Sequence, residues 1–248
     1  MLSKKNIYHL KNLQDKKYRY TCKEFVIETP KMLQEFFYTS SLFEFIEIYT
    51  LADFLTEIPI FLHPLTKVIT TEELQKISHL QTPQKVVARV KIPNLNIENF
   101  VQEKGIFLVA DHLQDPGNLG SLIRISDWFG FKAVICSEDS VDVYNTKTVQ
   151  ASMGSIARIP VFYVDLSIFL PKKSKNFQIF STELQGKPYS QVFLKEKNAF
   201  IVLGNEANGV SRKISDLAHQ KINIPKIGQA ESLNVSVAAG IFSAWFSQ

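Results

Sequence analysis

The sequence predicts an α/β protein, in which a parallel sheet covered by helices follows a small α/β module. First, near-continuous Val, Ile and Phe runs recur along residues 105–226, as in strands buried on both faces. Second, helix-like stretches separate these runs, which is the alternation typical of a parallel sheet. Third, residues 1–95 contain shorter, mixed elements. We therefore expect one domain over 1–95, a polar linker over 96–104 and a second domain over 105–248.

The N-terminal part begins with a basic segment. Residues 1–23 carry seven Lys and Arg side chains and one acidic side chain, Asp15, which leaves +6; since the whole chain carries +4, the remainder carries −2. Such a segment can lie along a phosphate backbone, and a solvated helix face explains the charge equally well. Aromatic rings stack on bases, and four of them among the lysines favour nucleic acid: Tyr8, His9, Tyr18 and Tyr20.

Five further elements are expected in the N-terminal part. Alternating apolar residues predict strands, whereas amphipathic spacing predicts helices. Thr70 or Thr71 suits the N-cap of the second helix, because acidic residues fill its first turn. In chain order we expect a strand over 21–29, a helix over 30–40, a strand over 43–50, a helix over 70–80 and a strand over 84–92.

Six strands are expected in the C-terminal part, over 105–111, 131–138, 157–165, 177–183, 199–206 and 221–226. Ligands of parallel sheets bind beyond the carboxyl ends of the strands. Three polar clusters lie at that edge: "DHLQDPGNLGSLIR" after the first strand, "GNEANG" after the fifth and "IPKIGQAESLNVSVAAG" after the sixth. Three polar turns at one edge favour a binding site over three separate structural turns.

Composition and missing motifs exclude several classes of protein. The chain is 45% hydrophobic and 21% charged, which is typical of globular proteins. No apolar stretch approaches the ~18–20 residues that span a bilayer, and the N-terminus has no apolar signal core, so we expect no membrane association and a cytoplasmic location. Neither the G-x-G-x-x-G fingerprint nor the phosphate-binding P-loop occurs.

No metal site is expected. Cys22 and Cys136 are far apart and have no metal-type spacing, and a reducing compartment is the simplest setting for them. Four histidines also lack metal spacing, and we interpret them as structural or solvated: His63, His79, His112 and His219.

Three segments carry a family resemblance. In order, "DPGNLGSLIRISDWFG" (115–130), "FIVLGNEANGVS" (200–211) and "KINIPKIGQAESLNVSVAAGI" (221–241) resemble the motifs of the SpoU, or TrmH-type, RNA 2′-O-ribose methyltransferases of the SPOUT superfamily. The resemblance implies S-adenosylmethionine as cofactor, an RNA substrate, a trefoil knot and a homodimer formed through the C-terminal domain. The N-terminal part is similar, less specifically, to the family's small RNA substrate-binding domain. Ile125-Ser126 and Ala207 depart from the usual Thr-Ala and Gly, and no proposed catalytic side chain is lost.

The resemblance implies that backbone groups of the late loops hold the cofactor. The matching positions are Gly204, Ile224 and Leu233, with Leu203, Thr182 and Ser232 beside them. Glycine lets the backbone approach closely, and apolar side chains exclude water from an adenine ring. Core packing is the alternative explanation for Ile224 and Leu233.

The resemblance also implies five catalytic residues. Arg124 stays protonated, so we expect it to clamp a phosphate and stabilise alkoxide charge rather than act as a base, and a surface salt bridge is its alternative. Asn118 could cap its helix and contact RNA. Glu206 could orient Arg124 or accept a proton. Ser232 and Asn234 are expected to begin the last helix, whose free N–H groups suit a polar ligand.

We therefore expect an S-adenosylmethionine-dependent methyltransferase that modifies a ribose 2′-hydroxyl in structured RNA, with ribosomal RNA favoured over transfer RNA. The alternative is a non-catalytic RNA-binding or assembly protein with a vestigial cofactor pocket, which would bind RNA without binding the cofactor. A nucleotide-linked enzyme of another α/β type is disfavoured by the missing glycine fingerprints. A single-stranded or looped target is expected, because its ribose is easier to reach.

Overall fold

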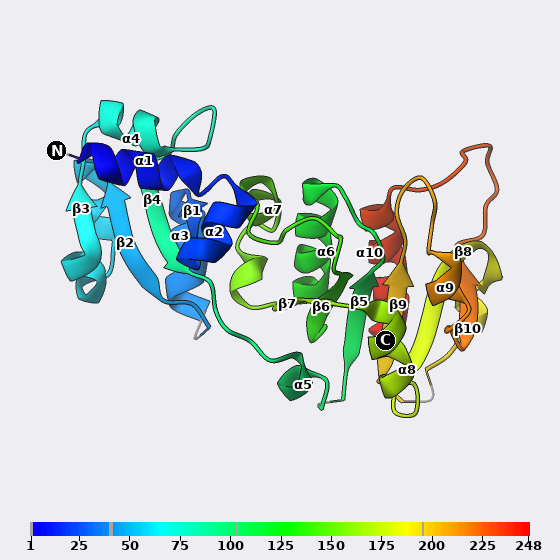
Figure 1. Ribbon diagram of the computed structural model, residues 1–248. Helices are drawn as coiled ribbons and strands as arrows, with labels where there is room; N and C mark the ends of the chain where they lie inside the picture. The colour runs from blue at the N-terminus through cyan, green and yellow to red at the C-terminus, as the bar shows by residue number, and fades with distance from the viewer. Residues whose placement is uncertain (1, 40–41, 103, 195) are drawn as a thin grey trace. The chain divides into compact units, whose positions relative to one another are not determined.

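The structure is a computed structural model that describes residues 2–39, 42–102, 104–194 and 196–248 (Figure 1). The chain divides into two compact units. Unit 1 contains residues 1–94 and 144–158, and unit 2 contains residues 95–143 and 159–248. Unit 1 therefore includes a segment that lies, in the sequence, between two strands of unit 2.

Unit 1 is built on a four-stranded sheet with the order β1-β4-β2-β3. Its strands are β1 (Glu24–Glu28), β2 (Phe45–Thr50), β3 (Thr66–Val68) and β4 (Val86–Lys91). β4 is antiparallel to β1 and β2, whereas β3 is parallel to β2. The strands expected over 21–29, 43–50 and 84–92 are confirmed in their central residues.

Helices cover both faces of this sheet. α1 (Lys4–Asn12), α2 (Lys16–Cys22) and α4 (Thr71–Ile77) lie on one face, over a core that includes Leu10, Val26, Leu74 and Val87. α3 (Pro30–Thr39) and α7 (Thr146–Ala151) pack against β1. The 3-10 helices of this unit are η1 (Ala52–Glu57), η2 (Ile60–Leu65) and η3 (Ser155–Ala157).

Two predictions for unit 1 concern the residues at which its helices begin and end. Thr70, not Thr71, caps α4, and it forms a reciprocal capping box with Glu73. The strand expected from residue 21 is wrong at its start, because Thr21 and Cys22 belong to α2. The left-handed backbone of Lys23, with φ +56°, ends the helix and lets the strand begin at Glu24.

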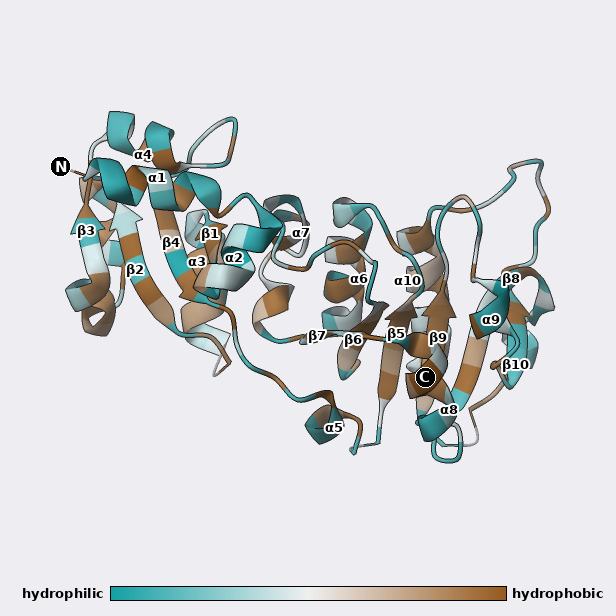
Figure 2. Ribbon diagram, in the orientation of Figure 1, coloured by the Kyte–Doolittle hydropathy of each residue, from teal (hydrophilic) through white to brown (hydrophobic). Residues whose placement is uncertain are grey.

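Unit 2 contains a six-stranded, fully parallel sheet with the order β10-β8-β9-β5-β6-β7. Its strands are β5 (Ile106–Ala110), β6 (Ala133–Ser137), β7 (Val161–Val164), β8 (Gln178–Pro188), β9 (Ala199–Leu203) and β10 (Gln220–Asn223). All six expected strands are confirmed, although the strand expected from residue 157 begins only at Val161, because Ala157 lies in η3. β5, β6 and β9 are buried throughout and are strongly hydrophobic (Figure 2).

Helices also cover both faces of the unit 2 sheet. α5 (Ile97–Phe100), α8 (Leu166–Lys173) and α9 (Arg212–Ser215) share one core cluster with Phe107 and Phe200. α6 (Pro116–Trp128) and α10 (Val235–Phe246) pack against each other, and the rings of Phe180 and Phe246 lie 4.9 Å apart. The short η4 (Tyr189–Gln191) leads to Val192, whose carbonyl accepts a 2.9 Å hydrogen bond from the Trp245 indole.

The strand order defines one point where ligands of such sheets bind. β5 continues outward to β6 and β7, whereas its other neighbour, β9, leads to β8 and β10. The hydrogen bond from Asp111 N to Leu203 O, at 2.8 Å, links the residue after β5 to the last residue of β9. The order reverses between β5 and β9, and ligands of open parallel sheets bind beyond the carboxyl ends of the strands at such a point. In the described parts of the chain, no helix has both the length and the apolar character needed to cross a bilayer.

Candidate active site at the carboxyl edge of the parallel sheet

The loop after β5 enters α6 through an aspartate cap. Asp115 Oδ1 accepts a 2.7 Å hydrogen bond from Asn118 N, and Pro116 occupies the first turn of the helix. Both features stabilise a helix start. The expectation that Asn118 caps this helix is therefore wrong. Because Asp115 is the cap, the side-chain amide of Asn118 is available for other partners.

Asn118 connects all three polar clusters. Its Nδ2 donates to a carboxylate oxygen of Glu206, from the loop after β9. Its Oδ1 accepts from Asn234 Nδ2 at 3.1 Å and from Ser236 Oγ at 3.0 Å, both at the start of α10. The expectation that the three clusters meet at one edge is confirmed by these contacts. Ser236 was not among the predicted residues, although it lies within the third motif.

The loop after β9 is a tight turn that requires glycine. A Cβ atom on Gly204 would lie 1.9 Å from the carbonyl carbon of Gly209 and 2.1 Å from Val210 N. Asn205 and Gly209 exchange two backbone hydrogen bonds of 3.0 and 2.8 Å, and Gly209 has φ +65°. Asn205 Oδ1 also accepts from Ala207 N at 2.9 Å. Alanine at position 207 is thus compatible with a well-bonded turn.

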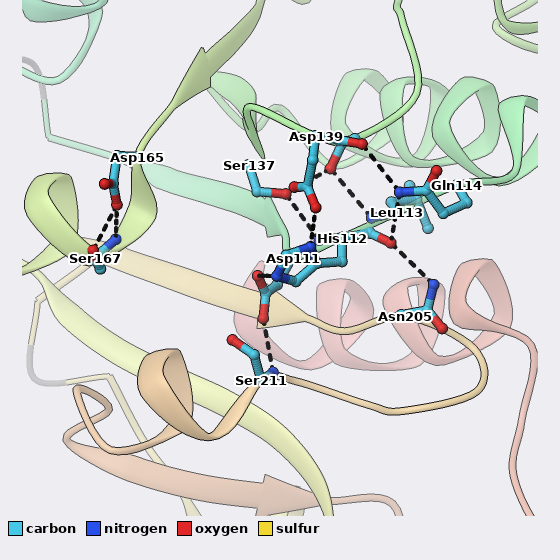
Figure 3. Close-up of polar contacts among 11 residues, drawn as sticks. Asp111, His112, Leu113, Gln114, Ser137, Asp139, Asp165, Ser167, Asn205 and Ser211 are labelled. Carbon is cyan, nitrogen blue, oxygen red and sulfur yellow. Dashed lines mark hydrogen bonds and ion pairs between the residues drawn. The ribbon is translucent and has the colours of Figure 1, made fainter.

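The same turn is tied to the end of β5 (Figure 3). Asn205 Nδ2 donates to the carbonyl of His112 at 3.0 Å. Asp111 is buried, and its Oδ2 accepts from Ser211 N at 2.7 Å. The carboxyl ends of β5 and β9 are therefore held together on both sides of the turn.

His112 lies at the same edge, in contact with two carboxylates (Figure 3). Its ring Nδ1 is hydrogen-bonded to Asp139, and its Nε2 lies 3.6 Å from Asp111 Oδ1. The backbone φ of His112 is +54°, which is unusual for a residue other than glycine. Partial burial acts to raise the pKa of Asp139, but hydrogen bonds from Ser137 and His112 lower that pKa below its usual value. The interpretation of His112 as merely structural or solvated overlooked this cluster, because Asp139 comes from the loop after β6.

Arg124 lies on α6 with an exposed side chain. Within the described residues it has no hydrogen bond or ion pair, so the surface salt bridge considered as its alternative role is absent there. The Glu206 carboxylate is bonded to Asn118 rather than to Arg124. Glu206 therefore does not orient the guanidinium directly, and the charge of Arg124 is available to a ligand.

The last cluster ends in a cap on α10. The helix begins at Val235, and Asn234 caps it by accepting from Ser236 N at 2.9 Å. Ser232 lies two residues before the cap and is exposed, so the expectation that it begins the helix is wrong. Asn234 joins the cluster around Asn118 directly, whereas Ser232 has no hydrogen bond to it among the described residues.

The residues expected around the cofactor lie in two different environments. Leu203 is buried, and Thr182 Oγ1 donates to the carbonyl of Val202 at 2.9 Å. Ile224 is half-buried, whereas Leu233 is 48% exposed, so core packing does not account for Leu233.

The loop before α10 offers the groups that a nucleoside needs. Among the described residues, the backbone of 226–233 makes no hydrogen bond to another residue. Its N–H and C=O groups can therefore form hydrogen bonds with a ligand. The exposed parts of the Ile224 and Leu233 side chains can pack against an apolar ring. These residues fit S-adenosylmethionine. No group of His, Cys, Asp and Glu side chains in the described ranges could hold a metal ion.

Comparisons with known proteins show what this chain is similar to. The profile of the SpoU rRNA methylase family matches residues 105–244. A Bacillus subtilis relative, the 23S rRNA (guanosine(2553)-2′-O)-methyltransferase RlmP, is 34% identical over 175 residues, which cover 70% of this chain and 68% of the relative.

Solved structures resemble the whole chain. One from Porphyromonas gingivalis, described as an RNA methyltransferase of the TrmH family, has a TM-score of 0.87 and 28% identity, with 99% of this chain and 98% of that chain covered. A Sinorhizobium meliloti rRNA methyltransferase with bound S-adenosylmethionine also has a TM-score of 0.87 and covers 99% of this chain and 96% of its own. At 24% identity, this second likeness concerns the fold alone.

Proposed function

Since this chain belongs to the SpoU rRNA methylase family, we propose that it transfers a methyl group from S-adenosylmethionine to a ribose 2′-hydroxyl of ribosomal RNA. RNA methyltransferase activity and the cofactor are properties of the family. The choice of ribosomal RNA is supported by the Bacillus subtilis relative, which acts on 23S rRNA. One observation supports the assignment to this site: Asn118 joins the three motifs through its side-chain hydrogen bonds. Arg124, on the same helix, has no partner among the described residues.

Arg124 is the group that we assign to the substrate. When bound, the cofactor supplies a methyl group on a positively charged sulfur. A ribose hydroxyl is a weak nucleophile, so its attack requires positioning and stabilisation of the negative charge that develops on oxygen. An exposed guanidinium can clamp an adjoining phosphate through two parallel hydrogen bonds and stabilise that oxygen.

The proton of the hydroxyl requires an acceptor, and we assign this role to Glu206. Its carboxylate accepts one hydrogen bond from Asn118 Nδ2, which fixes its position and leaves the other oxygen available. Asn234 and Ser236 hold the Asn118 amide from its opposite side. The cofactor would be enclosed by the backbone of Ser232 and Leu233 and by Gly204 and Ile224. Leu203 and Thr182 would pack behind these residues.

We also propose RNA binding by unit 1 and a homodimer formed through unit 2. The basic N-terminal segment supports RNA binding. For the dimer, support comes from apolar side chains that α6 and α10 leave uncovered, since Trp128 is 83% and Val237 is 51% exposed. The trefoil knot of the family is proposed for the chain from β9 to α10, and an experimental tracing of that segment tests it. A cytoplasmic location remains a prediction that goes with this substrate.

The direct test is transfer of tritium from methyl-labelled S-adenosylmethionine to ribosomal RNA from cells that lack the protein, followed by nuclease mapping of the ribose. We expect one major labelled nucleotide. Substitution Arg124→Ala should lower the rate by about 10²- to 10³-fold while S-adenosylhomocysteine still binds. Arg212→Ala is the matched control, because Arg212 is also exposed and contacts only Asp216 among the described residues.

Three outcomes distinguish the function, the role of Arg124 and the non-catalytic alternative. A wild-type protein that labels no RNA, or labels only bases, contradicts the function. An Arg124→Ala protein with the wild-type rate leaves the function intact but contradicts the role of that arginine. RNA binding without affinity for S-adenosylhomocysteine would instead support the non-catalytic alternative.

A further inference from the structure

Two consecutive helices of unit 1 repeat one pattern. A lysine, a tyrosine four residues later and a lysine three residues after that occur twice: Lys4, Tyr8 and Lys11, then Lys16, Tyr20 and Lys23. The first set lies in α1, and the second runs along α2 to its C-cap. Residues three and four apart share a helix face, so each tyrosine stands between two lysines. We call these six residues the Lys-Tyr stripe.

The stripe faces away from the core of unit 1. α1 turns Leu10 toward the sheet, and Leu13 continues that buried side. Tyr8 is 65% and Tyr20 is 42% exposed, and every lysine of the stripe is exposed. The edge of the Tyr20 ring packs against Tyr144 at 6.4 Å between ring centroids, which restrains the ring without covering it. Both helices carry strongly hydrophilic residues (Figure 2).

The positive charge of the stripe is not neutralised within unit 1. No lysine of the stripe has a carboxylate within salt-bridge distance among the described residues, whereas Lys67, Lys85 and Lys91 of the same unit are paired. The acidic residue in this segment, Asp15, is engaged in capping α2, where its Oδ1 accepts from Tyr18 N at 2.8 Å. The stripe therefore favours an anionic partner.

The other two aromatic side chains of the segment point inward. His9 Nδ1 lies 2.9 Å from Tyr18 Oη, and His9 Nε2 lies 2.8 Å from Glu24 Oε2. The same carboxylate oxygen pairs with Arg89 at 2.8 Å. His9 and Tyr18 therefore point into the fold, whereas the rings of Tyr8 and Tyr20 are exposed enough for a base to stack on them.

We propose that the Lys-Tyr stripe binds unpaired nucleotides of the RNA substrate, with phosphates on the lysines and bases stacked on Tyr8 and Tyr20. The inference rests on the proposed function and adds which face of unit 1 binds RNA and which kind of RNA it binds. Stacking on aromatic rings requires bases that are free of a helix, and A-form duplexes hide them. Lysines without aromatic rings would suffice for a duplex or for an anionic membrane.

The test uses the full-length protein and fluorescence anisotropy with a labelled single-stranded oligoribonucleotide and a fully paired duplex of the same sequence. Tyr8→Ala and Tyr20→Ala should each weaken single-strand binding from about fivefold to about 150-fold, and should leave duplex binding unchanged. Tyr8→Phe and Tyr20→Phe keep the ring and should retain affinity. The matched control is Tyr38→Ala, since Tyr38 is 77% exposed on α3 but has no lysine three or four residues away.

The lysines are tested by the salt dependence of binding. Each of Lys4→Gln and Lys16→Gln should reduce the slope of log affinity against log salt concentration by about 0.7, the contribution of one phosphate contact on a single strand. Lys91→Gln is the control, because Lys91 pairs with Glu44 at 3.0 Å. Thermal unfolding of each variant shows whether it remains folded.

Several results would overturn the inference. Unchanged single-strand affinity in both Tyr→Ala variants would do so, as would equal losses for single strand and duplex. Binding of the stripe to anionic vesicles but not to RNA would assign it to a membrane instead. If wild-type protein methylates RNA while the stripe variants bind single strands normally, the RNA-binding role of the stripe is refuted and the proposed function is retained. If stripe-dependent RNA binding occurs without any methyl transfer, the function fails and the stripe stands.

Discussion

An amide side chain suits the centre of the candidate site, because it donates on one side and accepts on the other. Asn118 uses its Nδ2 for the Glu206 carboxylate and its Oδ1 for Asn234 and Ser236. A carboxylate at position 118 would still accept from the last two groups. It could not donate to Glu206, and it would place a second negative charge against that carboxylate.

The charge at this contact gives the first prediction. Asn118→Asp should lower methyl transfer and destabilise the fold by about 1–3 kcal/mol, because the Glu206 carboxylate loses its donor and gains a repulsive neighbour. Adding Glu206→Gln should restore part of the stability, since its amide can donate to the new carboxylate. Denaturant unfolding measures this recovery, and Glu206→Gln alone is the control. No recovery in the double variant would count against the contact.

The second prediction concerns Gly204. Gly204→Ala should lower the free energy of unfolding by about 1–3 kcal/mol and weaken cofactor binding, because the added methyl group overlaps the backbone of Gly209. Gly240→Ala on α10 is the matched control, since nothing lies within 4 Å of the position of its added Cβ atom. Denaturant unfolding and calorimetry with S-adenosylhomocysteine measure the two effects. Equal behaviour of the two variants would refute the packing argument.

At the scale of elements, one buried histidine joins three parts of unit 1. His79 Nε2 lies 3.0 Å from the Leu10 carbonyl in α1, and its Nδ1 lies 3.2 Å from Thr146 Oγ1 at the start of α7. Its backbone N–H donates to Glu28 of β1 at 2.8 Å. Burial lowers the pKa of His79, and the charge of Arg19 adds to this, although the hydrogen bond with Leu10 opposes it.

The third prediction follows from the pKa of His79. The unfolded chain protonates this ring below about pH 6.5, whereas the folded chain resists protonation until a lower pH, so this stabilising contribution is present above pH 6.5 and is lost as pH falls. Replacement His79→Gln should make unfolding less dependent on pH between about 7.5 and 5.5. His63→Gln, at an exposed histidine, should leave the wild-type dependence. Urea unfolding at both pH values provides the measurement, and parallel curves for wild type and His79→Gln would contradict the prediction.

At the scale of the whole molecule, the two units are not consecutive stretches of chain. Residues 144–158 belong to unit 1, although they lie between β6 and β7 in the sequence. The Tyr144 ring lies 4.6 Å from that of Phe25, and Arg158 pairs with Glu35 at 2.5 Å. The chain therefore passes from one unit to the other three times, whereas two consecutive domains joined by one linker would need a single passage.

The fourth prediction concerns the proposed dimer. Val237→Glu on α10 should convert it to monomer, because a charge placed in an apolar interface loses its hydration. Ile168→Glu on α8 is the matched control, since Ile168 is 54% exposed but lies on a helix of the other sheet face. Sedimentation velocity over a range of concentrations distinguishes the states. A Val237→Glu protein that remains dimeric would place the interface elsewhere.

Local patterns predicted most of the architecture. Apolar runs located all six strands of unit 2, and the capping pattern around Thr70 located α4, because periodicity and capping act over a few residues. The helix α2 was missed over Thr21 and Cys22, where alternation resembles a strand but the Asp15 cap starts a helix. β3 was missed because only three residues pair.

By itself, the sequence determined that a parallel sheet carries three polar loops at one edge, and that Arg124 and Asn118 follow its first strand. Only the tertiary structure decided their partners. Asn118 meets Glu206 from 88 residues away and Ser236 from 118 residues away, and His112 meets Asp139 across a neighbouring loop. It also decided which tyrosines of the basic segment face solvent. Propensity and capping depend on neighbours in the chain, whereas these contacts depend on how packing brings distant segments together.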